Sequence, residues 1–113
     1  MRIGVKGRHF HVDDELRERV QRKAEKIARQ VSPLAELEVE LSEERNPAIR
    51  ESQIAEATLY LKGVTLRAHE ASPEMLESIH ELAEDIRRQV KRHREKRRGR
   101  ARTRRMMGRL RRA

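Results

Sequence analysis

The sequence predicts an α+β fold in which four strands and two helices follow in the order β-α-β-β-β-α. Two segments carry apolar residues at helical spacing, and four shorter segments alternate between apolar and polar residues. The chain of 113 residues is long enough for one hydrophobic core only. Because the strands are half apolar, both helices are expected on one face of a four-stranded sheet, with the other face left to solvent.

The first strand is expected over residues 2–7, where Ile3 and Val5 alternate with other residues. Asp13 suits the N-cap of the helix that follows, because its carboxylate can accept a backbone hydrogen bond from the first turn. Apolar residues then recur at helical spacing until Ser32-Pro33, which end the helix. This stripe consists of Leu16, Val20, Ala24, Ile27, Ala28 and Val31.

Three further strands are expected over residues 37–41, 53–61 and 64–70. The polar residues 42–52 predict a loop, and Lys62-Gly63 predicts a hairpin between the last two strands. The polar positions of these strands are expected on or near the open face of the sheet, which they would make acidic. They are Glu36, Glu38, Glu40, Glu56, Thr58 and Tyr60.

The second helix is expected to begin at Ser72-Pro73-Glu74, with serine as the N-cap and proline in the first helical position. Apolar residues recur at helical spacing over residues 75–90, and the helix is expected to end near Arg98, where Gly99 interrupts it. Residues 99–113 show no periodicity that could bury a face. We therefore expect an Arg-rich disordered tail there, or the start of a linker.

Composition excludes several classes of protein. Cysteine is absent, which excludes disulfides, thiolate catalysis, Fe–S clusters and cysteine-based zinc sites. Phe10 and Tyr60 are the only aromatic residues, which argues against domains that stack single-stranded bases on aromatic side chains. No apolar run is long enough for a membrane span and no signal peptide is evident, so we expect a cytoplasmic protein without a membrane partner.

Charge is distributed unevenly within the net charge of +9. Residues 1–86 carry 13 Lys/Arg and 18 Asp/Glu, whereas residues 87–113 carry 15 Lys/Arg and a single acid, Glu95. A mildly acidic body with an intensely basic end is typical of proteins that bind polyanions. Because the open face of the sheet is expected to be acidic, a polyanion is expected on the helical side.

Basic residues lie outside the apolar stripe of both predicted helices, at spacings that gather them on shared flanks. Two such flanks would bracket a groove suited to phosphates, with little base specificity. On the first helix an ordinary solvated face remains an alternative, since Glu18 and Glu25 can pair with its bases. The first helix carries Arg19, Arg22, Lys23, Lys26 and Arg29, and the second carries one row of Arg87, Lys91, Arg94 and Arg98 and another of Arg88, Arg92 and Lys96.

No motif for catalysis or for a bound cofactor emerges from the sequence. His9 and His11 near Asp13 make a poor metal site, because no second cluster of ligands accompanies them. Residues 4–7 match the GXXG string of KH domains, but they lie in a predicted strand rather than between two helices. Nucleophile motifs and glycine-rich phosphate loops are missing. We therefore expect no enzyme, no metal and no cofactor.

Several segments, in order and at the right spacing, resemble the family of ribosome hibernation promoting factors, also called ribosome-associated inhibitor or protein Y. The resemblance covers about residues 1–96. Asp85 departs from it, because the family commonly has lysine there, and Arg87 replaces a frequent acid. The matching segments are Lys6-Gly7-Arg8, Val12-Asp13, Leu16-Arg17, Lys23, Lys26, Arg29, Leu41-Ser42, Glu44, Asn46-Pro47, Leu61-Lys62-Gly63, Arg67-Ala68, Glu74-Met75, Ile79, Leu82, Arg88-Gln89, Arg92 and Lys96.

The resemblance implies a fold similar to a double-stranded RNA-binding domain and a ribosome-binding domain over residues 1–98. It implies binding to rRNA of the small ribosomal subunit at the decoding region, where the protein would compete with mRNA and tRNA and inhibit translation by idle ribosomes. We expect a monomer in isolation. The expected RNA contacts are Arg17, Arg22, Lys23, Lys26, Arg29, Arg88, Lys91, Arg92 and Lys96.

Two other functions remain open at this point. The Arg-rich tail could make the protein a general binder of double-stranded RNA or DNA without a defined ribosomal site. The basic helix could instead dock on an acidic protein partner.

Overall fold

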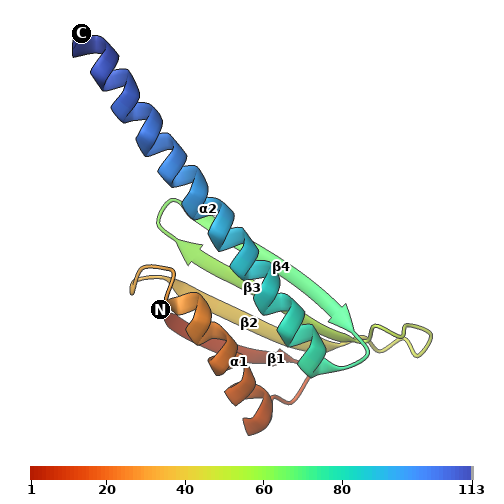
Figure 1. Ribbon diagram of the computed structural model, residues 1–113. Coiled ribbons are helices and arrows are strands. Elements are labelled where there is room, and N and C mark those ends of the chain that lie inside the picture. Colours follow the sequence, from red (N-terminus) through yellow and green to blue (C-terminus); the bar gives the residue numbers. More distant parts are fainter. Residues whose placement is uncertain (113) are drawn as a thin grey trace.

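The computed structural model describes the backbone of residues 1–112 and the side chains of residues 1–108. It contains one four-stranded sheet with both helices on the same face (Figure 1). The predicted α+β fold and its order of elements are therefore confirmed. The elements are β1 (Arg2–Arg8), α1 (Asp14–Ala28), β2 (Glu36–Glu43), β3 (Gln53–Leu61), β4 (Val64–Ser72) and α2 (Met75–Arg112).

The strands lie in the sheet in their chain order, β1-β2-β3-β4. β1 pairs with β2 in parallel, from Arg2 opposite Glu36, and α1 is the crossover that this parallel pair requires. β2, β3 and β4 pair antiparallel, and the turn at Lys62-Gly63 joins the last two as a hairpin. Gly63 has a φ of 79°, the left-handed conformation that glycine adopts without strain.

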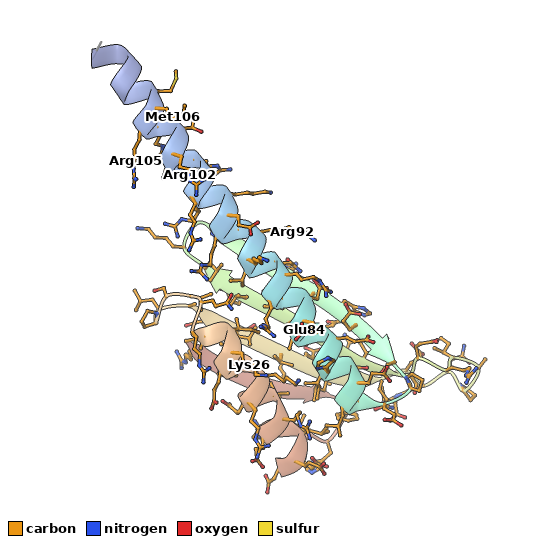
Figure 2. All side chains as sticks on the ribbon, viewed as in Figure 1. Lys26, Glu84, Arg92, Arg102, Arg105 and Met106 are labelled. Atoms are coloured by element: carbon orange, nitrogen blue, oxygen red, sulfur yellow. The ribbon has the colours of Figure 1, made fainter. Side chains whose placement is uncertain are left out.

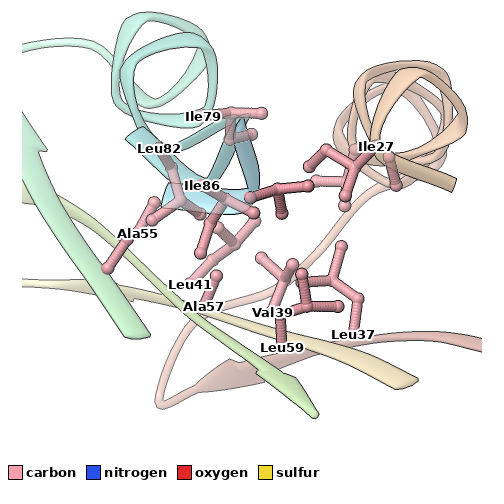
Figure 3. Close-up of a cluster of buried hydrophobic side chains, with 14 of the residues drawn as sticks. Ile27, Leu37, Val39, Leu41, Ala55, Ala57, Leu59, Ile79, Leu82 and Ile86 are labelled. Carbon is pink, nitrogen blue, oxygen red and sulfur yellow. The ribbon is translucent and has the colours of Figure 1, made fainter. Parts of the chain in front are cut away.

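The hydrophobic core fills the space between the helices and the sheet (Figure 3). Alternate residues of β2 and β3 point into it, and Leu41 and Leu59 are fully buried there. Ala55 and Ala57 are small, which lets α2 approach β3 closely. α2 packs mainly on β4 and β3, whereas α1 packs against α2 and β1. The core thus fixes α2 on the sheet and α1 beside it.

The cap of α1 is the one that the sequence predicts. The backbone nitrogen of Leu16 donates to Oδ1 of Asp13 at 2.8 Å. α1 ends at Ala28, before Ser32-Pro33.

α2 begins at Met75 rather than at Pro73, so the predicted N-cap at Ser72 is wrong. Ser72 still pairs with Gln53 in the sheet, and this pairing keeps it in β4. Its hydroxyl lies 2.7 Å from that of Ser78, which donates to the backbone oxygen of Gln53 at 2.6 Å. These buried hydroxyls anchor the first turn of α2 to the start of β3.

α2 also ends much later than predicted. The helix continues through Gly99 to Arg112, so the expected end near Arg98 and the expected disorder beyond it are wrong for residues 99–112. One glycine in a helix costs about 1 kcal/mol relative to alanine, and the arginines, alanine and methionines around Gly99 favour a helix. Ala113 lies outside the described residues. That residues 99–113 act apart from the domain of residues 1–98 stays a prediction.

The C-terminal part of α2 projects beyond the sheet (Figure 1). Val90 is the last buried residue of the helix, and the side chains of residues 94–107 are all exposed. We call residues 94–112 the arm. At a rise of 1.5 Å per residue the arm is about 28 Å long, within a molecule 67 Å in its longest dimension.

The turn between β1 and α1 depends on Gly7. His9 adopts a φ of 50°, which folds the chain back so that a Cβ on Gly7 would lie 1.9 Å from the backbone oxygen of Phe10. A Cβ on Gly4, in the same strand, would meet nothing within 4 Å. The sequence therefore needs glycine at the seventh position for space and not for strand formation.

We expect Gly7→Ala to lower the free energy of unfolding by about 1–3 kcal/mol, because a backbone atom must move to admit the new Cβ. Gly4→Ala is the matched control, and we expect it to leave stability unchanged or raise it by up to about 1 kcal/mol. Urea denaturation followed by circular dichroism measures both. Equal stability of the two variants would show that the close approach at Phe10 is absent in solution.

Candidate nucleic-acid interface

One hydrogen bond shows which flank of α2 faces α1. Nζ of Lys23 lies 2.8 Å from Nδ1 of His80, and because the ammonium can only donate, the imidazole accepts through Nδ1. Four basic residues follow His80 at steps of seven, four, three and four residues, and this helical spacing places them on the same flank. We call them the α1-facing row, which consists of Arg87, Lys91, Arg94 and Arg98.

The opposite flank of α2 is tied to β4, where Nε2 of Gln89 donates to the backbone oxygen of Arg67 at 2.8 Å. Between the two flanks, Arg88 and Arg92 lie exposed on the side of α2 that points away from the sheet. Lys96 follows at the same spacing. We call Arg88, Arg92 and Lys96 the outer row. Figure 2 shows Arg92 of this row and, further along α2, Arg102 and Arg105 of the arm.

The basic residues predicted on the first helix cover two adjoining sides of α1. Lys23 and Lys26 lie three residues apart on the flank toward α2, whereas Arg22 and Arg29 lie nearer its outer side. Arg17 lies apart from all of these, because its Nη1 donates to a backbone oxygen of β1 at 3.3 Å. The structure thus brings Lys23, Lys26 and Lys91 toward the space between the helices and places the outer row beside it.

Three of the nine predicted residues already have partners within the protein. Arg17 binds the β1 backbone, Arg22 forms an ion pair with Glu18 at 2.6 Å, and Lys23 binds His80. Among the side chains of residues 1–108, the other six form no ion pair with the protein. These six are Lys26, Arg29, Arg88, Lys91, Arg92 and Lys96, and all are exposed. They can meet an external anion without breaking an ion pair.

The nine predicted residues leave out part of the α1-facing row. Arg87, Arg94 and Arg98 share a helical flank with Lys91, and Arg87 also forms an ion pair with Glu84 at 3.0 Å. Their spacing is visible in the sequence. That this flank is turned toward α1 depends on the packing of the two helices, which the spacing does not contain.

The open face of the sheet is balanced in charge, so the expectation of an acidic face is wrong. This face carries four glutamates and an equal number of Lys/Arg residues. The cations come from the two edge strands, β1 and β4. Glu40 pairs with Lys6 at 3.5 Å and with Arg8 at 3.4 Å, and Glu36 lies 3.8 Å from Arg2. The unpaired cations on the helical side still make that side the better surface for a polyanion.

A pair of carboxyl groups lies where α2 meets β4. Partial burial, followed by the hydrogen bond and charge of the Asp85 carboxyl, raises the pKa of Glu70 above its ordinary value, while Arg88 acts in the opposite direction. A raised pKa means that the folded state favours protonated Glu70. The contribution of Glu70 to stability is therefore fully present below its ordinary pKa and is lost as the pH rises through the raised one.

We expect Glu70→Gln to stabilise the protein at pH 7, because the amide cannot ionise beside Asp85. The gain should shrink as the pH falls through the raised pKa of Glu70, because the carboxyl group then becomes protonated and the folded state no longer opposes its charge. Chemical denaturation of both chains at several pH values measures the difference in the free energy of unfolding. Glu51→Gln, in an exposed loop, is the control. A gain that grows on acidification would contradict the assignment.

In residues 1–112, none of the helices has the length and apolarity needed to cross a membrane.

The sheet, the two helices on one face and the unpaired cations on those helices define a small α+β protein with a basic helical surface. Residues 3–98 match the model of a family described as Sigma 54 modulation protein / S30EA ribosomal protein, and the chain belongs to this family. The resemblance found in the sequence is thereby confirmed. The match ends at the start of the arm, most of which lies beyond it.

One relative with a known role is a ribosome hibernation promotion factor from Picosynechococcus sp. (strain ATCC 27264 / PCC 7002 / PR-6). It is 30% identical over 97 residues, which cover 85% of this chain. The match covers 50% of the relative, so the chain spans about half the length of that protein.

Two solved structures share the fold. The N-terminal domain of Protein Y from Thermus thermophilus superposes with a TM-score of 0.69 at 24% identity, over 82% of this chain and 99% of that one. A ribosomal subunit interface protein from Coxiella burnetii gives a TM-score of 0.70 at 18% identity, over 84% and 99%. Both leave part of this chain unmatched.

Proposed function

We propose that this protein is a ribosome hibernation factor of the cytoplasm. It binds rRNA of the small ribosomal subunit at the decoding region, occupies the channel of mRNA and tRNA, and inhibits translation by idle ribosomes. It acts as a monomer by occlusion and without catalytic turnover.

The observation that carries this proposal is the set of six unpaired cations on the helical side of an S30EA-family fold. Arginine and lysine side chains of this kind bind phosphates and fix a protein on folded RNA without reading bases. The names of two similar proteins, a ribosome hibernation promotion factor and a ribosomal subunit interface protein, support a ribosomal partner.

The test combines sedimentation with tRNA binding. Purified protein is mixed with isolated small or large ribosomal subunits at physiological salt and centrifuged through sucrose, and displacement of tRNA from the small subunit is then titrated. We expect co-sedimentation with the small subunit and displacement that saturates near one protein per subunit. Full inhibition of translation far below the ribosome concentration would indicate turnover and contradict occlusion.

The arm favours a second candidate, a general binder of double-stranded RNA or DNA. Residues 94–112 contain 11 Lys/Arg and one acid, and a helix with such a charge attracts any nucleic acid. Equal affinity for the small subunit and for an unrelated duplex, together with no displacement of tRNA, would support this candidate over hibernation.

A further inference from the structure

Most arginines of the arm fall into two rows along the helix, and one of these rows continues a row of the body. Starting from Arg94, arginines follow at steps of four, four and three residues and so share one flank of α2. The same spacing continues in the sequence with Arg109 and Arg112. We call this set the arm row; its members with described side chains are Arg94, Arg98, Arg102 and Arg105.

The arm row prolongs the α1-facing row of the body. Arg94 and Arg98 belong to both, because the helix continues without a break from His80 through the arm. The hydrogen bond from Lys23 to His80 places this flank on the side of α1. Among the described side chains, one line of cations therefore runs from the space between the helices to Arg105.

We propose that the arm is a second RNA-binding element, in which the arm row contacts the sugar-phosphate backbone of a double-helical RNA segment. Neighbouring members of the row are three or four residues apart, which is about 4.5–6 Å along the axis. A regular ladder of guanidinium groups fits a regular ladder of phosphates, because each guanidinium can bind phosphate oxygens with two parallel hydrogen bonds.

The described part of the arm forms no ion pair that would neutralise its cations. Glu95 is its one acid, and among the described side chains of residues 94–108 no ion pair forms. Like charges four residues apart on a helix repel one another and weaken it. Phosphates placed along the row would remove this repulsion, so binding and the stability of the arm helix should reinforce each other.

The apolar content of the arm argues against a lipid surface. A helix that lies on a membrane needs a continuous apolar face. Among the described arm residues, the large apolar side chains are Met106 and Met107, which are exposed, and Gly99 and Thr103 precede them on the same side as Met106. The Thr103 hydroxyl donates to the Gly99 backbone oxygen at 3.0 Å, so it is directed onto the helix itself.

This proposal goes beyond the proposed function, because it concerns residues that lie mostly outside the family match at residues 3–98. It requires no ribosome, since the partner is defined by its duplex phosphates alone. The two proposals can therefore fail separately.

The test compares two variants of the full chain that lose three arginines each. The row variant carries Arg98→Gln, Arg102→Gln and Arg105→Gln, and the matched control carries Arg97→Gln, Arg100→Gln and Arg104→Gln. Glutamine keeps the helix propensity close to that of arginine, and circular dichroism checks the helix content. The probe is a blunt RNA duplex of unrelated sequence, with binding followed by fluorescence anisotropy at several salt concentrations.

We expect the row variant to lose about two to three units of the slope of log affinity against log salt, because it loses three phosphate contacts. Near 100 mM salt its affinity should fall roughly a hundredfold, and that of the control less than tenfold. Equal losses of RNA affinity in the two variants would contradict binding by the arm row and would indicate diffuse electrostatic attraction instead. Unchanged RNA affinity in both, with row-dependent binding to vesicles of phosphatidylserine and phosphatidylcholine, would assign the arm to a membrane surface instead.

Discussion

Neutralising four unpaired cations of the body is expected to abolish displacement of tRNA from the small subunit. The variant carries Lys26→Gln, Arg29→Gln, Arg88→Gln and Arg92→Gln. These side chains are exposed and make no ion pair among the described side chains, so their loss removes contacts to RNA and leaves the core intact. At roughly 0.7–0.9 decades per phosphate near 100 mM salt, four lost contacts weaken binding by about three decades.

Lys23 is left out of this variant because it already binds His80 of α2. The matched control neutralises four other exposed cations, Arg45, Arg50, Lys62 and Arg67, in the loops and on the open face. It makes the same change in net charge away from the helical side. If the control loses tRNA displacement as completely as the variant does, net charge and not the helical surface governs binding.

Binding of the intact chain to the small subunit should fall steeply with salt. Six unpaired cations on the helical side, with further contacts from the rest of the arm, correspond to roughly six to ten neutralised phosphates. Between 50 and 200 mM salt, a protein with that many contacts loses about three to five decades of affinity, because each contact releases a counterion. A linear plot of log affinity against log salt gives the number of contacts.

A chain truncated after Arg98 is the control for this measurement. Its log affinity should still fall clearly with log salt because of the cations on the body, but with a smaller slope because most contacts of the arm are lost. It should still displace tRNA. A nearly flat salt response of the intact chain would remove phosphate contacts as the basis of binding, whatever the affinity.

Much of the fold could be predicted because local patterns determined it. Leu37, Val39 and Leu41 alternate with glutamates and all three are buried in β2. The end of α2 could not be predicted in the same way, because one glycine opposes a helix only weakly when its neighbours favour one. Ser72 would suit an N-cap, but its pairing in the sheet with Gln53 prevails over that local preference.

In the candidate site, too, local features could be predicted and features that depend on packing could not. The exposure of Arg88 and Arg92 follows from their place outside the apolar stripe, and the structure has both exposed. The flank of α2 that faces α1 follows only from packing between elements, as does the parallel pairing that sets β1 cations beside β2 glutamates. The balanced charge of the open face therefore could not be predicted by considering each strand alone.

Because α2 is one continuous helix, inserting residues into it would change the direction in which the arm row points. Because the body and the arm share one helix, the direction of the arm row around the axis is decided by the packing of Met75 to Val90 on the sheet. Adding one residue just after His93 would turn the row by about 100° away from α1, since a helix has 3.6 residues per turn. Adding seven would restore its direction to within about 20° and move it about 10 Å outward. The rotational phase of α2 thus matters more to the arm than its length.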